Sequence, residues 1–257
     1  LTYSGSGAPS VEGINFKAMK GQTIGVIGGT GSGKSSLVNL IPRLYDATQG
    51  EVLVDGVNVK DYDIEALRNK VGIVMQKAVL FKGTIRENMW MGKKGATDEQ
   101  IDEALEISQS KEFVDSKQGR LDYVIEQGGK NLSGGQRQRL TIARAIVRKP
   151  DVLILDDSAS ALDFATDAAL RKAIRGMNNS PTVFIVSQRA ASLMYADLII
   201  VLDDGQVAGM GTHDELLANC EVYKEIYESQ FKKADSEGGV ACLLYTSPSP
   251  RDRTRSR

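Results

Sequence analysis

Short runs of apolar residues alternate with longer amphipathic stretches along most of the chain. Residues 23–27, 71–74, 152–155 and 182–186 are mostly apolar throughout, a pattern typical of parallel strands that are buried on both faces. The longer stretches between these runs place apolar residues at helical spacing. Strands that alternate with helices in this way predict an α/β fold.

Two hairpin signals flank this alternation. Asp55-Gly56 joins residues 51–54 to residues 57–59, and Asp204-Gly205 joins residues 197–202 to residues 206–210. An Asp-Gly pair between two apolar segments is a strong signal for a two-residue hairpin turn. We therefore expect antiparallel pieces near the start and near the end of the chain.

Helix signals lie between the strands. Residues 34–44 carry apolar side chains at helical spacing, with Pro42 as a kink or an early end of the helix. Residues 133–149 predict a helix that closes on basic residues just before Pro150.

Two further helices are expected in the middle and at the end of the chain. Thr97 and Gln100 form a capping-box signature at the start of one of them. A polar and apolar helical pattern covers residues 214–231, and we expect the only histidine, His213, to have a structural capping role there.

The composition is that of a folded globular chain. Of its 257 residues 41% are hydrophobic and 25% charged, and 32 Lys and Arg balance 33 Asp and Glu. Without a basic excess the chain has no global electrostatic reason to bind nucleic acid. The longest apolar runs, such as residues 198–202, are much shorter than the ~20 residues that cross a bilayer. Cys220 and Cys242 have no metal-ligand spacing, which favours a reducing compartment.

Both ends of the sequence are unusual. It begins at Leu1 without an initiator Met, in strand-like sequence and with no signal-peptide pattern, so we expect a piece of a longer protein. Residues 234–257 end in a segment rich in Pro and Arg that has no hydrophobic period. We expect an unfolded tail or a translated cloning remnant there, and a basic arm for nucleic acid or anionic lipid is the alternative.

A glycine-rich turn follows the first strand and precedes the first helix, as the P-loop pattern requires. Its glycines let backbone N–H groups surround phosphate oxygens. Lys34 would reach the β- and γ-phosphates, Ser35 would ligate Mg²⁺, and Asp156 at the end of a strand would hold the same ion through water. These residues predict a site for Mg²⁺ and the phosphates of a nucleotide, and by themselves they do not identify the reaction. The residues assigned to nucleotide contact in this turn are Gly28, Gly29, Thr30, Gly31, Ser32, Gly33, Lys34, Ser35 and Ser36.

A second anion site is indicated about a hundred residues after Lys34, between the P-loop and Asp156. Ser133 is a good helix N-cap, and the two glycines that follow it leave backbone amides uncovered at a helix start. The chain's own P-loop need not fill this site. The motif consists of Leu132, Ser133, Gly134, Gly135 and Gln136.

With these motifs, residues 1–233 resemble the ATP-binding cassette (ABC) family. The resemblance implies a P-loop NTPase (RecA-like) core with an antiparallel β subdomain, and an inserted α-helical signature subdomain at about residues 84–148. It also implies that Gln76 contacts Mg²⁺ and the helical subdomain, and that Tyr3 stacks on adenine. The D-loop of the family corresponds to Ser160, Ala161, Leu162 and Asp163.

Residues 83–88 and Glu126 resemble exporters of this family, in which an acid at the position of Glu126 contacts the membrane domain. The resemblance implies a transmembrane domain, fused N-terminally and absent here, and a place on the cytoplasmic face of a membrane, the plasma membrane being expected. The same residues disfavour an importer. A chromosome ATPase is disfavoured because no coiled coil lies between Gly33 and Leu132, and a nucleotide kinase because it has no use for the signature motif.

Two residues depart from the family pattern. Asp157 stands where the family has a Glu that polarises the attacking water. One methylene fewer withdraws the carboxylate by about 1–1.5 Å, and a general base must lie within about 3 Å of the proton that it takes. Gln188 stands where the family has a His that contacts the γ-phosphate, and Gln cannot become a cation. With Gln76, these two residues are the candidate catalytic residues.

The head-to-tail dimer of the family turns these departures into a hypothesis. Each ATP lies between the P-loop of one protomer and the signature of the other, so this chain would hold ATP with slow turnover. Its signature would complete the active site of a second, non-identical half-transporter subunit, and no nucleic acid is expected as a partner. The alternative is a gating or regulatory module that binds ATP without hydrolysing it, and only the rate of hydrolysis separates the two. The transported substrate is not indicated.

Overall fold

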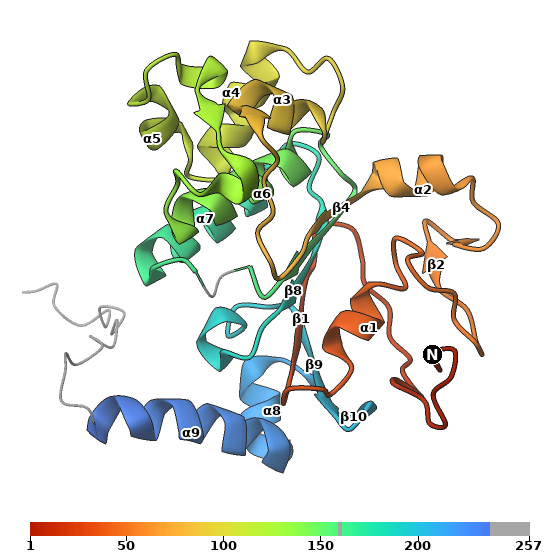
Figure 1. Cartoon of the computed structure of the whole chain (residues 1–257). Coiled ribbons are helices and arrows are strands. Elements are labelled where there is room, and N and C mark those ends of the chain that lie inside the picture. Colours follow the sequence, from red (N-terminus) through yellow and green to blue (C-terminus); the bar gives the residue numbers. More distant parts are fainter. Residues whose placement is uncertain (159–160, 237–257) are drawn as a thin grey trace, which may run out of the picture.

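The computed structural model describes residues 1–158 and 161–236, and a six-stranded sheet lies at its centre (Figure 1). The strands lie in the order β10-β9-β1-β8-β7-β4. Within this sheet only β10 is antiparallel to its neighbour, and the other strands are parallel. The expected α/β fold is confirmed. The strands are β1 (Thr23–Gly28), β4 (Val71–Val74), β7 (Val152–Asp156), β8 (Thr182–Val186), β9 (Leu198–Asp203) and β10 (Gln206–Gly211).

Successive side chains of the central strands enter two separate hydrophobic cores. Leu153 and Leu155 of β7 belong to one core, and Ile154 between them belongs to the other. Each of these three side chains is at most 3% exposed. Burial on both faces of the sheet explains why the strands are apolar without alternation in the sequence.

Helices cover both faces of the sheet. Leu37 and Val38 of α1 (Lys34–Val38) and Leu67 of α2 (Ile64–Lys70) belong to the same core as Ile154. Lys70, the last residue of α2, pairs with Asp55 in a hairpin at a distance of 2.9 Å. The hairpin strands are β2 (Leu53–Val54) and β3 (Val57–Asn58). The opposite core includes residues of α6 (Gly134–Ile146), α7 (Phe164–Arg175), α8 (His213–Asn219) and α9 (Glu221–Ser236), together with residues of the helical lobe.

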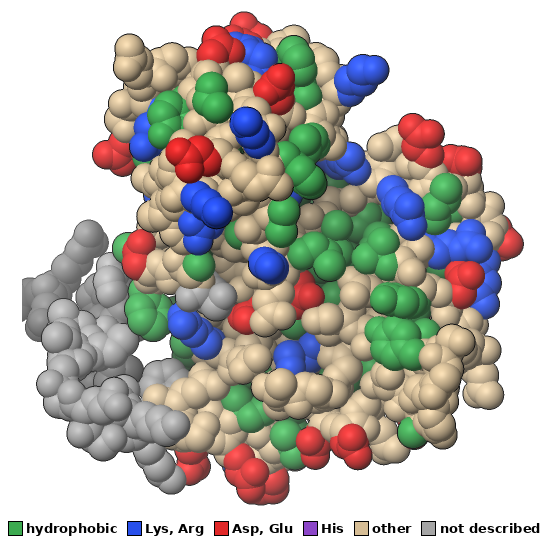
Figure 2. All heavy atoms as spheres, in the orientation of Figure 1, with side chains coloured by type: hydrophobic (Ala, Val, Ile, Leu, Met, Phe, Trp, Pro, Cys, Tyr) green, Lys and Arg blue, Asp and Glu red, His purple; other side chains and the backbone are tan. Residues whose placement is uncertain are grey.

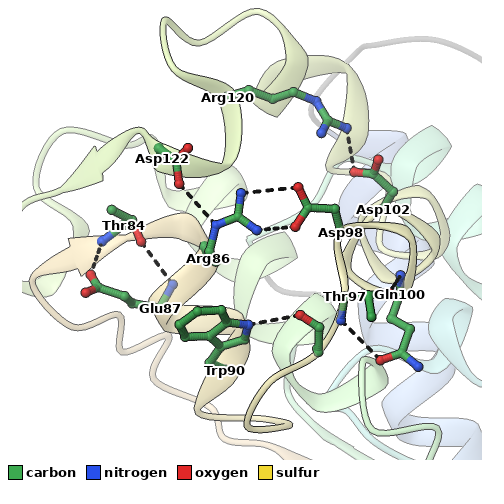
Figure 3. Close-up of polar contacts among 11 residues, drawn as sticks. Thr84, Arg86, Glu87, Trp90, Thr97, Asp98, Gln100, Asp102, Arg120 and Asp122 are labelled. Carbon is green, nitrogen blue, oxygen red and sulfur yellow. Dashed lines mark hydrogen bonds and ion pairs between the residues drawn. The ribbon is translucent and has the colours of Figure 1, made fainter.

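A helical lobe stands at the top of Figure 1. Arg86 of its first helix pairs with Asp98, at the start of the next helix, and with Asp122 (Figure 3). Thr84 and Thr97 each begin a helix with a complete capping box, which confirms the expectation for Thr97. Helix α6 packs against α3, α4 and β4, so it joins the lobe to the sheet. The lobe contains β5 (Gly83–Thr84), α3 (Ile85–Trp90), α4 (Asp98–Ile107), α5 (Lys111–Asp115), η1 (Arg120–Asp122), β6 (Val124–Ile125) and η2 (Gln127–Gly129).

Both Asp-Gly hairpins form as predicted. Asp55 and Gly56 have φ angles of 51° and 78°, and Asp204 and Gly205 have φ angles of 44° and 78°. Positive φ at both central residues is the requirement of the two-residue turn that matches strand twist. The turns therefore fix the β2–β3 and β9–β10 pairings.

Two helical predictions differ in their limits from the structure. Helix α1 ends at Val38, so the early end expected from Pro42 is confirmed, and it comes before the proline itself. The pattern over residues 214–231 is divided into α8 and α9, because Cys220 between them has extended backbone with φ −123° and ψ 103°. The capping role expected for His213 is wrong. Thr212 caps α8, and Nδ1 of His213 lies 2.8 Å from the hydroxyl of Tyr223 in α9.

The strand expected at the start of the sequence is also wrong. Residues 1–22 contain no strand, and the backbone–backbone hydrogen bonds of residues 1–12 close within that segment or onto the turn between β9 and β10. The amino group of Leu1 donates to the carbonyl of Val11 at 2.7 Å, and the amide of Glu12 donates to the carbonyl of Gly205 at 2.9 Å. The segment is thereby folded back over the β9–β10 turn.

The described residues also bear on the membrane and on the tail. None of the helices in residues 1–158 and 161–236 is both long enough and apolar enough to cross a bilayer. Helix α9 continues to Ser236, three residues into the predicted tail. Residues 237–257, with Cys242, lie outside the described residues.

Candidate nucleotide site

Four neighbouring parallel strands end at one edge of the sheet, and their carboxyl ends carry the predicted nucleotide residues. In the order β1, β8, β7 and β4, the strands lead into the P-loop, Gln188, Asp156 with Asp157, and Gln76. Asp156 lies in register with Val186 of β8. The carboxyl edge of a parallel sheet is where open α/β folds bind ligands. The topology therefore brings together groups that are far apart in sequence.

Glycine shapes the loop between β1 and α1. Gly31 and Gly33 have φ angles of 83° and 90°, which glycine adopts without strain. A Cβ atom on Gly33 would lie only 2.4 Å from Cγ1 of Val11. Gly29, Thr30 and Gly31 are exposed at the tip of the loop. Their backbone amides are therefore open to an anionic ligand.

Lys34 is buried at the base of this loop. Burial lowers its pKa, and the negative charges of Asp156 and Asp157 oppose that shift. A cation that is desolvated in this way attracts anions more strongly than an exposed one. Its Nζ donates to three acceptors in the loop itself, the carbonyls of Gly28 and Gly29 at 3.0 and 2.6 Å and the Ser32 hydroxyl at 3.4 Å.

Asp156 and Ser35 form an oxygen-donor pair. Asp156 is 5% exposed and accepts a hydrogen bond from the Ser35 hydroxyl. Burial raises the pKa of Asp156, and the Ser35 bond opposes the shift. Carboxylate, hydroxyl and the amide oxygen of Gln76 are hard donors of the kind that Mg²⁺ takes together with substrate phosphates. The residues present therefore fit Mg²⁺.

Asp157 sits on a strained backbone beside this pair. Its φ is 46°, and its amide donates to the carbonyl of Val186 at 2.9 Å. Nε2 of Gln76 donates to Oδ2 of Asp157 at 3.3 Å. The structure thus places two of the three candidate catalytic residues in contact.

The third candidate, Gln188, is exposed in the loop after β8. Its side chain has no hydrogen bond among those found in residues 1–158 and 161–236, whereas its carbonyl oxygen accepts from Nε2 of Gln230 at 2.7 Å. The loop is also attached to the sheet, because the amide of Ser187 donates to the carbonyl of Val26 at 3.1 Å. Gln188 thus has a fixed backbone and a solvent-facing side chain.

The N-terminal segment reaches the P-loop helix through Tyr3. The Tyr3 hydroxyl lies 2.9 Å from Oγ of Ser36, and its ring meets that of Tyr45 edge to face at 4.8 Å. Tyr3 is half-buried. Tyr45 was not predicted, since only the fold brings it beside Tyr3.

The signature residues begin helix α6. Oγ of Ser133 accepts from the amide of Gln136 at 3.2 Å, and Oε1 of Gln136 accepts from the amide of Ser133 at 3.1 Å. Leu132 is buried, while Ser133 and Gly134 are exposed. The start of this helix therefore faces solvent with glycine in its first turn.

The signature lies against the D-loop. A Cβ atom on Gly135 would lie 3.3 Å from the carbonyl oxygen of Ala161. Leu162 is buried, and Asp163 caps α7 by accepting from the amide of Thr166 at 2.9 Å. Ser160 lies outside the described residues.

The family model described as ABC transporter matches residues 11–160 of this chain. An uncharacterized ABC transporter ATP-binding protein of Mycobacterium tuberculosis is 43% identical over 243 residues, which cover 93% of this chain and 41% of that protein. Another from Bacillus subtilis, YfiB, is 45% identical over 224 residues, covering 87% of this chain and 39% of that protein. The chain thus spans about two fifths of the length of these relatives.

Two further similarities concern exporters. A Staphylococcus aureus protein that carries the name multidrug export ATP-binding/permease protein is 39% identical over 228 residues, which cover 89% of this chain and 39% of that protein. A solved structure of a bacterial Atm1-family ABC exporter with ATP bound matches with a TM-score of 0.81 and 32% identity. That match covers 86% of this chain and 39% of the exporter chain.

Proposed function

Because the chain belongs to the ABC transporter family, we propose that it binds and hydrolyses ATP as the motor part of an exporter. The observation that carries the proposal is the convergence of the P-loop, Asp156 and Gln76 at one sheet edge, with a separate signature at the start of α6. The similarity to a multidrug export protein and to an exporter structure supports the same conclusion.

Different residues at the sheet edge bind different parts of the nucleotide in this proposal. The backbone of residues 28–33 surrounds the phosphates, and Lys34 neutralises their charge. Ser35 and Asp156 hold Mg²⁺, which when bound offsets the negative charge of the phosphates. Tyr3 lies beside the P-loop helix through its bond to Ser36, which supports its assignment as the adenine-stacking residue.

We infer further that the site is poor at hydrolysis. A general base must lie within about 3 Å of the proton that it takes, and Asp157 is one methylene shorter than the Glu of the family. Its carboxylate also accepts from Gln76. Gln188 cannot supply the positive charge of a histidine. The two departures affect the same reaction step.

The signature serves a second protomer in this proposal. Among the described residues, no hydrogen bond joins Leu132–Gln136 to the P-loop, and Ser133 and Gly134 are exposed. A helix start that leaves amides facing outward suits an anion supplied from outside the chain. We propose that this anion is the ATP of a second, non-identical half-transporter subunit.

The other partner in the proposal is a transmembrane domain at the cytoplasmic face of a membrane. Figure 2 shows hydrophobic side chains gathered in the hollow below the helical lobe. Met75, Val79 and Phe81, on the loop between β4 and β5, are 47%, 42% and 50% exposed. Exposed apolar groups in one segment mark interaction surfaces. The segment adjoins Gln76, so a domain docked there would be coupled to the nucleotide edge.

Single-turnover hydrolysis tests the proposal. The chain is mixed in excess over radiolabelled Mg²⁺-ATP, and bound nucleotide and released phosphate are followed separately. We expect binding that the Lys34→Ala substitution abolishes, with phosphate release that is slow. The exposed Lys20→Ala substitution is the matched control for charge and should leave binding unchanged.

The outcomes separate the candidate functions. No binding of Mg²⁺-ATP would contradict an ATP-dependent role altogether. Brisk hydrolysis by the unmodified chain alone would contradict the slow site. Binding with no phosphate release over many hours would favour the alternative, a gating module that binds ATP without hydrolysing it.

A further inference from the structure

The side chain of Gln230 in α9 forms two hydrogen bonds with the loop that carries Gln188. Its Nε2 donates to the carbonyl of Gln188 at 2.7 Å, and its Oε1 accepts from the amide of Ala190 at 3.0 Å. One amide group thereby satisfies a backbone acceptor and a backbone donor two residues apart. Ala190, the first residue of η3 (Ala190–Ser192), is fully buried.

These two bonds fix the peptide planes on both sides of Arg189. The carbonyl of Gln188 belongs to the plane before Arg189, and the amide of Ala190 belongs to the plane after it. The first of these planes is held a second time, because the amide of Arg189 donates to Oγ of Ser187 at 2.9 Å. The orientation of the Gln188 backbone therefore depends on a contact 42 residues away.

Helix α9 is held firmly enough to serve as an anchor. Tyr223 is fully buried, and its hydroxyl lies 2.8 Å from Nδ1 of His213. Gln230 follows Tyr223 by two helical turns, so both lie on the face of α9 that packs on the protein. The ring of His213 also lies against Tyr227, with ring centroids 5.3 Å apart. The backbone of Gln230 cannot move away from the loop without disturbing these contacts.

We propose that Gln230 is a positioning residue, which sets the direction of the Gln188 side chain and so controls how the chain senses the γ-phosphate of ATP. The inference rests on the proposed function and on the position of Gln188, where the family has a His that contacts that phosphate. It assigns to the last described helix a direct part in distinguishing ATP from ADP.

The test uses Gln230→Met, which keeps the length and the helix propensity of the side chain and removes both hydrogen bonds. Affinities for Mg²⁺-ATP and Mg²⁺-ADP are measured for the purified chain. We expect the preference for ATP over ADP to fall about fivefold, the effect of roughly one net hydrogen bond, with the ADP affinity unchanged. Ser229→Ala, on the exposed neighbouring position, is the control and should leave both affinities unchanged.

A double-mutant cycle distinguishes positioning from a general structural effect. If Gln230 acts through Gln188, the Gln230→Met substitution has no further effect on the ATP preference in a Gln188→Ala background. In the nucleotide-free state, the Ala190 amide should exchange its hydrogen faster in the Gln230→Met single variant than in the wild-type chain. An unchanged ATP preference, additive losses in the cycle, or unchanged exchange overturns the inference and leaves the proposed function standing. A wild-type chain that binds no Mg²⁺-ATP overturns both.

Discussion

Nε2 of Gln76 lies 3.3 Å from Oδ2 of Asp157. The two residues follow β4 and β7, which are adjacent and in register from Val71 with Val152 to Val74 with Leu155. Gln76 belongs to the loop with the exposed apolar residues, and Asp157 follows the buried carboxylate of Asp156. A movement of that loop would therefore change the contact with Asp157, the carboxylate proposed to act in hydrolysis.

Lengthening this carboxylate tests whether it limits hydrolysis. We expect Asp157→Glu combined with Gln188→His to raise the single-turnover rate by about 100-fold, the lower end of the roughly 10²–10⁴-fold that general-base catalysis supplies. Asp157→Asn combined with Gln188→His is the control, because it removes the base and keeps the added histidine. An equal rate in both double variants, with ATP binding intact, would refute the assignment of Asp157.

The signature can be tested in the same background by complementation. Gly134 is the first residue of α6, and a Cβ atom there meets nothing closer than 4.0 Å. An aspartate at the start of a helix interacts favourably with the helix dipole, so the Gly134→Asp variant should fold. Its negative charge should repel a phosphate. Adding Gly134→Asp to the restored double variant should abolish hydrolysis and leave ATP binding at Lys34 unchanged.

Mixing then identifies which protomer supplies the signature. The triple variant has a competent P-loop side and a blocked signature, and the unmodified chain has the opposite combination. If ATP lies between two protomers, the mixture hydrolyses ATP although neither component does so alone. A mixture that stays inactive, under conditions in which the restored double variant is active, would contradict hydrolysis between protomers.

The sequence predicted what depends on local pattern. Continuous apolar runs located the central strands, the Asp-Gly pairs located both hairpins, and the P-loop motif located Lys34 between β1 and α1. Each of these features depends on a few consecutive residues. Burial on both faces of the sheet restricts a strand to apolar residues, and positive φ angles restrict turns and loops to residues such as glycine.

The contacts between distant segments were not predictable in the same way. Gln230 binds backbone groups of Gln188 and Ala190. Because these backbone groups do not depend on the side chain, the residue types at the two positions give no sign of the contact. His213 illustrates the same limit, since its bond to Tyr223 depends on the break between α8 and α9. Such positions become visible only when the fold places the segments together.

The buried carboxylate of Asp156 makes stability depend on pH. Burial raises its pKa, so between the ordinary aspartate pKa and the raised value the folded state holds more protons than the unfolded state. The free energy of unfolding therefore falls as pH rises through that interval. Above the interval the full free-energy cost of burying the ionised carboxylate is present. We expect Asp156→Asn to remove this cost, which raises the melting temperature at neutral pH by about 2–4 °C for each kcal/mol regained.

Thermal melts at several pH values check this prediction. The gain of Asp156→Asn over the wild type should be large at neutral pH and should shrink as the pH is lowered toward the ordinary range of aspartate. The same variant should lose the Mg²⁺ dependence of ATP binding. A gain that is independent of pH would show that the carboxylate's ionisation is not its source.

Asn88 tests how the loop beside the nucleotide edge is held. It is fully buried, and its side chain accepts from the amide of Phe81 at 3.0 Å and donates to the carbonyls of Phe81 and Thr84 at 2.9 and 3.0 Å. Asn88→Ala removes the side-chain partner of these three backbone groups, so we expect a loss of about 2–3 kcal/mol in the free energy of unfolding. Urea denaturation measures it against the exposed Asn178→Ala, expected within about 0.5 kcal/mol of the wild type. Equal effects of the two substitutions would mean that the loop is held by other contacts.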